Sequence, residues 1–328
     1  MTNPAPRVSV VIPTYQRAHL LGDVIETLLA QTLDDIEVIV ADDGSTDATG
    51  AVVQRIGDRR LTYLRRAHLG MPAILNEGFA AARGAYVMTC HDHDIYEPSL
   101  LEELADALDR FPSAAYAHSG LLVVDPGGTT VVERHVHAFA PLTPGRTFLA
   151  THLLAGLDSA VSALTMVRAS ALSGRALDPA YGFVADVELW LRLASHGDVA
   201  YVNRPLIRVR QRDASSELSR VSHQLALHVL RAKRAYLPLV TDSRRRLQIE
   251  RSWRRHARGT VLRELLYARP EQRDQVLSDL GALAAETGSG PARLAVAAFR
   301  RTPLRVSAGA LRSIRYTARL WRGVAAAR

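Results

Sequence analysis

Residues 76–98 read NEGFAAARGAYVMTCHDHDIYEP, and this stretch decides the fold. Its pattern predicts a helix, a turn at Gly84 and a short apolar strand over 85–90, followed by carboxylates and imidazoles at 91–94. A buried strand that ends in such a cluster puts side chains able to bind a metal at the carboxyl edge of a sheet. Open α/β sheets bind their ligands at that edge.

Two earlier segments have the same arrangement of an apolar strand followed by polar residues. Residues 36–41 (IEVIVA) form a β-branched run that is typical of a strand buried on both faces, and the polar run 42–47 follows it. Residues 7–13 (RVSVVIP) are followed by Thr14-Tyr15-Gln16-Arg17. Each of the three strands therefore ends in groups that can bind a ligand.

Helices alternate with these strands. The apolar spacing over 19–31 is helical, and a second helix is predicted over 48–56 before a short strand at 61–64. This order predicts a mostly parallel α/β sheet with right-handed crossovers. The strand ends at Thr14, Asp42 and Asp92 would then share one crevice.

Four segments together resemble a known family. VSVVIPTYQR (8–17), VADDGSTDAT (40–49) and the stretch 76–98 are similar to the nucleotide-binding half of a family 2 glycosyltransferase of the GT-A fold. Residues 182–197 (GFVADVELWLRLASHG) are similar to that family's acidic-residue helix. The resemblance covers roughly residues 7–215. It implies a Rossmann-like catalytic domain over 1–219, with a nucleotide-binding half (1–98) and an acceptor half (99–219).

The resemblance also implies a donor site. Asp43 matches the carboxylate that contacts the nucleobase, and Asp42 stands beside it. The nucleobase pocket would be lined by Pro13, Thr14 and Tyr15, while Arg17 would reach a phosphate. Local chemistry offers another interpretation, in which Asp43, Gly44 and Ser45 only turn the chain and cap the next helix.

The metal motif departs from the family pattern. Members commonly have Asp-x-Asp before a segment that aligns with Ile-Tyr-Glu-Pro at 95–98 here. In that alignment Asp92 contacts the ribose and diphosphate and His93 takes the metal position, whereas Asp92-His93-Asp94 gives a second register. The predicted metal residues are therefore Asp92, His93 and Asp94. Because Mg²⁺ prefers oxygen ligands, we expect Mn²⁺ to be favoured over Mg²⁺. His91 is expected to pack at the strand end or to orient Asp92.

Asp186 is the predicted general base. It opens a helix over 185–195, and the resemblance implies that it activates the acceptor hydroxyl and inverts the anomeric centre. The family's Glu before this residue is Ala185 here. Glu188 is an alternative base, and a third interpretation makes Asp186 a charge that only stabilises the helix N-terminus.

Arginines follow a predicted strand at 199–202. The segment 203–216 carries Arg208, Arg210 and Arg212. Guanidinium groups bind phosphates through paired hydrogen bonds, so Arg210 and Arg212 are predicted to contact the donor diphosphate. Otherwise this segment is an alternating strand whose arginines face water.

Composition and charge separate the two parts of the chain. The 328 residues include one cysteine, Cys90, which favours a reducing cytoplasm, and no secretory leader or run of 18 apolar residues is recognised. Residues 1–219 carry 18 basic and 26 acidic residues, whereas 220–328 carry 23 basic and 7 acidic residues. The sequence pI near 10 is thus a property of the C-terminal third.

That third is predicted to be helical, over 223–239, 242–267, 271–286 and 304–326. The last helix is basic and amphipathic, so we expect it to bind an anionic membrane surface, peripherally on the inner face of the cell membrane, near a lipid-linked acceptor. It could instead pack on the catalytic domain or form a homo-oligomer. Nucleic acid is not an expected partner, because this region has no readable recognition motif.

The resemblance implies an inverting transfer of sugar from a nucleotide-sugar donor, with UDP or dTDP favoured. The expected acceptor is a hydroxyl of a glycan or lipid-linked intermediate of a cell-surface polysaccharide. His93 and Ala185 motivate an alternative, a non-catalytic scaffold that binds nucleotide sugars at the membrane. A nucleotidyltransferase would need a Gly-rich loop after the first strand, and residues 14–21 contain no glycine.

Overall fold

The computed structural model describes residues 5–157, 164–172, 176–211, 222–267 and 273–301. The chain divides into two compact units. The first comprises residues up to 220 together with His228–Ile249, and the second comprises Val221–Leu227 and the residues from Glu250 onward. The predicted domain boundary at residue 219 stays a prediction.

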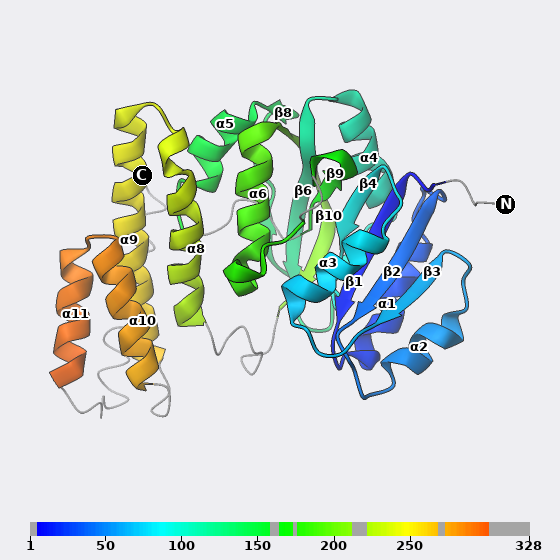
Figure 1. The fold of residues 1–328 in the computed structure, drawn as a ribbon, viewed down its shortest axis with the longest axis horizontal. Helices are drawn as coiled ribbons and strands as arrows, with labels where there is room; N and C mark the ends of the chain where they lie inside the picture. The colour runs from blue at the N-terminus through cyan, green and yellow to red at the C-terminus, as the bar shows by residue number, and fades with distance from the viewer. Residues whose placement is uncertain (1–4, 158–163, 173–175, 212–221, 268–272, 302–328) are drawn as a thin grey trace. The chain divides into compact units, whose positions relative to one another are not determined.

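The N-terminal part of the first unit is a parallel α/β layer (Figure 1). Its strands are β1 (Val8–Thr14), β2 (Ile36–Asp42), β3 (Leu61–Arg65) and β4 (Tyr86–Thr89). The helices between them are α1 (Ala18–Leu29), α2 (Thr49–Ile56) and α3 (Met71–Ala81). The spatial order is β3-β2-β1-β4. Because β4 joins on the other side of β1, a topological switch point lies between the ends of β1 and β4, where open sheets bind ligands.

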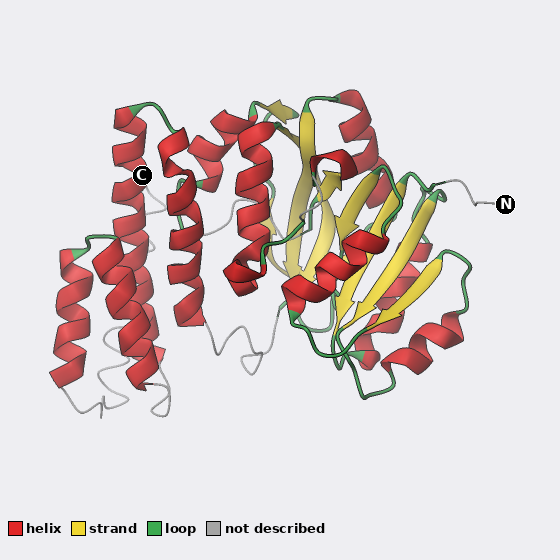
Figure 2. Cartoon of the chain, in the orientation of Figure 1, coloured by secondary structure: helices red, strands yellow, loops and turns green. Residues whose placement is uncertain are grey.

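The sheet continues past β4 with mixed strand directions (Figure 2). These strands are β9 (Met166–Arg168), β6 (Ala114–Val124), β10 (Asp198–Arg210) and β5 (Ile95–Tyr96), with β7 (Val131–His135) on β6 and β8 (Leu142–Thr143) on β10. The α/β prediction with a mostly parallel sheet is confirmed. β10 is longer than the predicted strand at 199–202, and its second half pairs with β5 directly after the His-Asp cluster.

Three helical elements follow in the middle of the chain. They are α4 (Leu100–Arg110), the short α5 (Gly145–Phe148) and the π-helical turn η1 (Leu149–Leu153). Three-residue 3₁₀ turns η2 (Ala169–Ala171) and η4 (Leu237–Leu239) occur later in the chain. The 3₁₀ segment η3 (Pro179–Val184) leads into α6 (Ala185–His196). The remaining helices are α8 (Ser222–Tyr236), α9 (Ser243–Tyr267), α10 (Arg273–Glu286) and α11 (Gly290–Arg301). The predicted helix over 304–326 lies outside the described residues.

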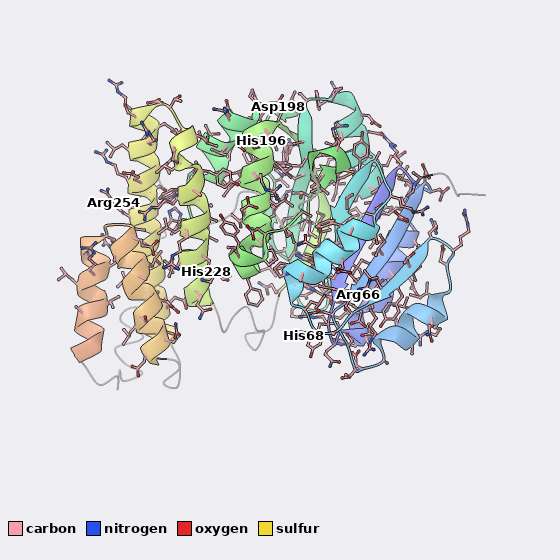
Figure 3. All side chains as sticks on the ribbon, in the orientation of Figure 1. Arg66, His68, His196, Asp198, His228 and Arg254 are labelled. Atoms are coloured by element: carbon pink, nitrogen blue, oxygen red, sulfur yellow. The ribbon has the colours of Figure 1, made fainter. Side chains whose placement is uncertain are left out.

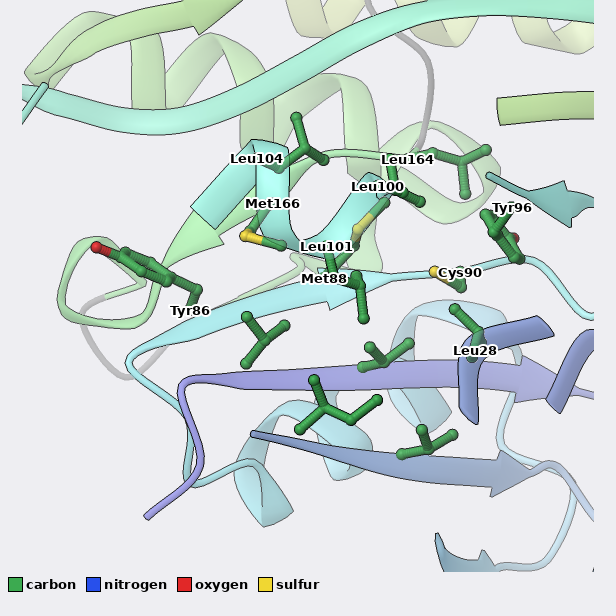
Figure 4. Close-up of a cluster of buried hydrophobic side chains, with 14 of the residues drawn as sticks. Leu28, Tyr86, Met88, Cys90, Tyr96, Leu100, Leu101, Leu104, Leu164 and Met166 are labelled. Carbon is green, nitrogen blue, oxygen red and sulfur yellow. The ribbon is translucent and has the colours of Figure 1, made fainter. Parts of the chain in front are cut away.

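Helices cover both faces of the sheet, with α1 on one face and α3 and α6 on the other (Figure 1). α1 and α4 bury apolar side chains with helical spacing in the core shown in Figure 4. On the other face Gly78 brings α3 very close to β1, since an added Cβ would lie 2.3 Å from Cγ1 of Val11. The strand ends that carry the polar clusters are thereby fixed on a rigid support.

A search of the described residues for bilayer-spanning segments finds no helix with the length and apolar character required.

Candidate functional site

The carboxylate of Asp92, in the loop that follows β4, is buried next to the end of β1. Thr14 at the end of β1 donates its hydroxyl to Asp92 Oδ2 at 2.9 Å. Arg17 Nε lies 3.8 Å from Asp92 Oδ1, and His93 Nδ1 lies 2.9 Å from the same oxygen. The structure therefore brings four of the predicted site residues together at the switch point.

A candidate metal centre lies in the same loop. One ligand atom each from His91, His93 and Asp94 can be chosen so that all three lie within 4.8 Å of one another. The two imidazole rings are stacked, with centroids 5.3 Å apart. Nε2 of His93 is buried and has no hydrogen-bond partner in the described part of the chain. An unsatisfied buried nitrogen is costly unless it binds something, so this donor set fits a metal ion.

This candidate ligand set, His91, His93 and Asp94, differs from the predicted set of Asp92, His93 and Asp94. His91 Nδ1 lies 2.8 Å from Asp94 Oδ2, so the expectation that His91 orients Asp92 is wrong. Asp92 is not part of the close group of ligand atoms. Two nitrogens and one oxygen suit a transition metal better than magnesium.

Asp94 is held in its charged form. Burial raises the pKa of this carboxyl, but the hydrogen bond with His91 and the nearby imidazoles outweigh burial and lower the pKa overall. The backbone N–H of Arg210 donates to Asp94 Oδ1 at 3.1 Å. Nη1 of Arg210 donates to the carbonyl of His93 at 2.9 Å. Arg210 thus supports the metal loop, and its contact with a donor stays a prediction.

The two neighbouring carboxylates after β2 have different environments. Asp42 is fully buried, and it accepts hydrogen bonds from the backbone N–H of Ser45 at 2.9 Å and from the hydroxyl of Tyr63. Burial and this hydrogen bond raise the pKa of Tyr63. The Ser45 contact of Asp42 therefore lies within the turn, although the turn-forming interpretation named Asp43, Gly44 and Ser45.

Asp43 is also buried, but it faces an exposed aromatic pair. Its oxygens accept hydrogen bonds from the backbone N–H groups of Leu69 at 2.6 Å and Gly70 at 3.0 Å, and His68 Nδ1 lies 2.9 Å from Oδ2. The rings of His68 and Tyr15 have centroids 4.6 Å apart, and Tyr15 is 45% exposed. Sequence reasoning missed His68, although it follows β3, whose end adjoins that of β2. Pro13 lies within β1 and pairs in register with Ala41.

Asp186 lies in the first turn of α6, partly buried, and its Oδ1 accepts the backbone N–H of Val187 at 2.7 Å. Figure 3 places His68 at one end of the sheet and His196, the last residue of α6, at the other. The first turn of α6 is thus directed toward the edge that carries the polar clusters.

The alternative base and the remaining arginines are engaged elsewhere. Glu188 is buried, and it accepts hydrogen bonds from Arg192 Nε at 3.2 Å and from the Tyr236 hydroxyl at 2.6 Å. Arg208 Nε donates to Glu97 at 2.8 Å. Arg212 lies outside the described residues.

The rings of three histidines lie close to the ring of Phe139. The His118 ring is completely buried, and its centroid lies 5.9 Å from that of Phe139, while His137 and His152 lie at 4.7 and 4.4 Å. Burial, together with the charges of His137 and His152, lowers the pKa of His118 to about 3. His118 is therefore neutral in the folded protein at physiological pH.

The sequence is similar to known glycosyltransferases. The model of glycosyl transferase family 2 matches residues 9–162. An uncharacterized glycosyltransferase of Rickettsia typhi is 26% identical over 218 residues, which is 65% of this chain and 66% of that protein. The chain thus matches just under two thirds of that relative's length.

Solved structures share the fold. TarS of S. aureus (residues 1–349) in complex with UDP superposes with a TM-score of 0.66 at 16% identity, over 91% of this chain and 93% of TarS. Glucosyl-3-phosphoglycerate synthase of Mycobacterium tuberculosis, in complex with Mn²⁺, UDP and glucosyl-3-phosphoglycerate, gives a TM-score of 0.50 at 22% identity, over 73% of this chain and 82% of that one. The model of glycosyl transferase family 2 thus covers the segment of the chain that carries the strand-end site.

Proposed function

We propose that this chain is an enzyme that transfers a sugar from a nucleotide-sugar donor to a hydroxyl acceptor with inversion. The observation that carries the proposal lies at the topological switch point between β1 and β4. There Thr14, Asp92 and His93 are joined by hydrogen bonds, within the residues 9–162 that match the family model. Ligands of open α/β sheets bind at this position.

The donor nucleobase is placed beside Asp43, between that carboxylate and the rings of Tyr15 and His68. A carboxylate whose oxygens already accept backbone N–H groups can still accept another N–H, which uracil and thymine offer. Either base suits this position, and we propose UDP or dTDP as the nucleotide. TarS has been solved with UDP and also with UDP-GlcNAc, which supports UDP-linked sugars as the first donors to test.

The diphosphate is placed over the loop 91–94, within reach of Arg17, and with Arg212 as a further predicted contact. Mn²⁺ held by His91, His93 and Asp94 would neutralise the charge that develops on the leaving diphosphate. Asp92 would orient the ribose and diphosphate through its contacts with Thr14 and Arg17. The Mn²⁺ complex of the mycobacterial synthase supports a divalent metal in this fold.

The reaction needs one base and one displacement. Asp186 would remove the proton of the acceptor hydroxyl as its oxygen bonds to the anomeric carbon. The bond from that carbon to the diphosphate oxygen breaks on the opposite side, which inverts the configuration. Nucleoside diphosphate leaves with the electron pair.

Isothermal titration of UDP, dTDP and GDP, each with Mn²⁺, Mg²⁺ or EDTA, tests the donor site. We expect micromolar binding of UDP or dTDP that depends on Mn²⁺, followed by slow hydrolysis of a matching nucleotide sugar. Binding without turnover of any donor would favour the scaffold alternative. Failure to bind any nucleotide would overturn both proposals.

The acceptor is proposed to be a glycan or lipid-linked intermediate of a cell-surface polysaccharide. The support is the basic C-terminal third, which would hold the enzyme peripherally at the anionic inner face of the cell membrane where such lipids occur.

A further inference from the structure

We infer that Asn76 and Arg192 are positioning residues that fix the segment 176–186, and with it the base Asp186. We call residues 176–186 the base segment. The inference rests on the proposed function, because it concerns the residue assigned there as general base. Neither positioning residue touches Asp186 through any contact recorded in the described structure.

Asn76 binds the start of the base segment at two points. Its Nδ2 donates to the carbonyl of Leu177 at 2.8 Å, and its Oδ1 accepts the backbone N–H of Leu177 at 2.8 Å. The amide thus pairs with Leu177 as a neighbouring strand would. A primary amide offers a donor and an acceptor on one planar group, and among side chains only Asn and Gln carry one. An aspartate here would place an acceptor against the Leu177 carbonyl.

Arg192 binds the preceding residue from the helix that carries the base. Its Nη2 donates to the carbonyl of Ala176 at 2.6 Å. Its Nε donates to Glu188 Oε1 at 3.2 Å, and the hydroxyl of Tyr236 donates to the same oxygen at 2.6 Å. Glu188 therefore holds the guanidinium in place, which accounts for a buried carboxylate two residues after the proposed base.

Between these anchors and α6 the base segment runs through the 3₁₀ segment η3, which also contacts α3 and α6. Gly182 in η3 has φ 52° and ψ −128°, and Phe183 is 42% exposed. The end of the base segment at 176–177 is fixed by the hydrogen bonds of Asn76 and Arg192.

The helix that carries Asn76 also begins next to Asp43, the carboxylate proposed to contact the nucleobase. Gly70, the residue that precedes α3, donates its backbone N–H to Asp43. α3 therefore links the proposed nucleobase site at its first turn to the base segment at Asn76. We infer that this link sets the base relative to the bound donor, so its loss should lower kcat while leaving donor binding unchanged.

Asn76→Asp is the test variant, and Glu77→Gln is its matched control. Glu77 is the next residue on α3, and its ion pair with Arg66 at 2.9 Å lies on the surface. In Asn76→Asp we expect kcat to fall roughly 10- to 100-fold, as a displaced catalytic group would cause. We expect the donor KM and the UDP Kd to stay within about twofold, since a lower kcat with unchanged donor binding indicates the loss of an interaction made only in the transition state. Glu77→Gln should behave as wild type.

Hydrogen exchange gives a readout that does not depend on turnover. Amides of residues 176–186 should exchange faster in Asn76→Asp and not in Glu77→Gln, while the amides of β1 and β4 should be unchanged. Unchanged exchange at 176–186, or a fall in UDP affinity equal to the fall in kcat, would overturn the inference. Arg192→Lys should reproduce the loss of kcat, because an ammonium cannot bridge Ala176 and Glu188 as a guanidinium does.

Failure of the proposed function would look different. If the wild-type chain bound no nucleotide and turned over no donor, the assignment of Asp186 as base would fall, whatever the exchange data showed. If the wild type were active and Asn76→Asp kept its full kcat, only the positioning role would be wrong.

Discussion

The carboxylate of Asp186 is the single group on which the proposed chemistry depends. Replacing it with asparagine keeps the shape and removes the base, so Asp186→Asn should lower kcat by about 10²–10⁴-fold. UDP affinity should not change, because Asp186 is assigned to the acceptor and not to the nucleotide. Initial rates and calorimetry on the same preparation measure both quantities.

Glu188→Gln is the informative comparison. Its carboxylate is held by Arg192 and Tyr236, so the variant should lose stability and, through Arg192, part of its turnover. A Glu188→Gln enzyme that lost more turnover than Asp186→Asn would contradict the assignment and make Glu188 the base.

The metal ligands can be separated from their neighbour Asp92. His91→Ala removes one nitrogen of the close group, and we expect Mn²⁺ to bind at least about tenfold more weakly in saturating UDP. Electron paramagnetic resonance of free Mn²⁺ measures this affinity. His196→Ala at the far end of α6 is the control. Full Mn²⁺ affinity in His91→Ala, with a loss in Asp92→Asn, would restore the set predicted from the sequence.

His118 should make the fold sensitive to acid. Burial and the neighbouring imidazoles lower its folded pKa to about 3, against an ordinary value of 6.5. The unfolded chain therefore binds the proton first, so this contribution to stability is complete above pH 6.5 and declines as the pH falls toward 3, by up to about 1.4 kcal/mol per pH unit.

Urea unfolding between pH 7.5 and 5 tests this expectation. The midpoint should fall with pH in the wild type and fall less in His118→Phe, which keeps an aromatic ring among Phe139, Phe148 and Tyr201. His135→Gln on the exposed strand β7 is the control. If the urea midpoint fell with pH at the same slope in all three proteins, His118 would not be the cause of this pH dependence.

At the scale of elements, the geometry of the proposed site depends most on the position of α3. Its Gly78 faces β1, and a methyl group there would overlap Val11 at 2.3 Å. We expect Gly78→Ala to lower the free energy of unfolding by about 1–3 kcal/mol, as overpacking does.

Gly22→Ala in α1 is the matched control, because its added Cβ would meet Val52 at an ordinary 3.5 Å. In a helix that change should stabilise by up to about 1 kcal/mol. Equal effects of the two substitutions in urea unfolding would mean that α3 does not pack tightly on β1.

The elements near the site were the most predictable from sequence. Buried apolar runs predicted β1 and β2 and helical spacing predicted α1, because these patterns are local, while the family resemblance predicted α6. The strand predicted at 199–202 continues in β10 to Arg210, as the alternating-strand alternative for the arginine segment had it, and β6 pairs with that part.

Contacts between distant residues were not predictable. The pairing of Asn76 with Leu177 spans 101 positions, and nothing local marks either residue. His91, and not Asp92, lies within hydrogen-bond distance of Asp94 because of the way the backbone turns after β4. His68 was missed because its role comes from the end of a neighbouring strand. In each case the deciding interaction is tertiary.

At the scale of the whole molecule, the uneven charge is the feature with a functional consequence. Residues 220–328 hold 23 of the 41 basic residues and 7 of the 33 acidic ones. Four arginines of the predicted last helix, Arg312, Arg315, Arg319 and Arg322, would each contribute about 1 kcal/mol at an anionic surface. That region lies outside the described residues, so its role is predicted from sequence alone.

Vesicle sedimentation with the full chain tests this role. Binding to vesicles that contain anionic phosphatidylglycerol should exceed binding to neutral phosphatidylcholine, and it should weaken as salt is raised. Changing the four arginines to glutamine should weaken binding by at least about tenfold, since even part of the roughly 4 kcal/mol would suffice. In the control variant, four exposed arginines of the first unit are changed to glutamine: Arg55, Arg59, Arg110 and Arg134. The two quadruple variants then carry the same net charge. If both quadruple variants lost binding equally, net charge and not the last helix would govern attachment. Binding that ignored lipid charge would remove the membrane from the proposal and leave the acceptor to be sought among soluble glycans.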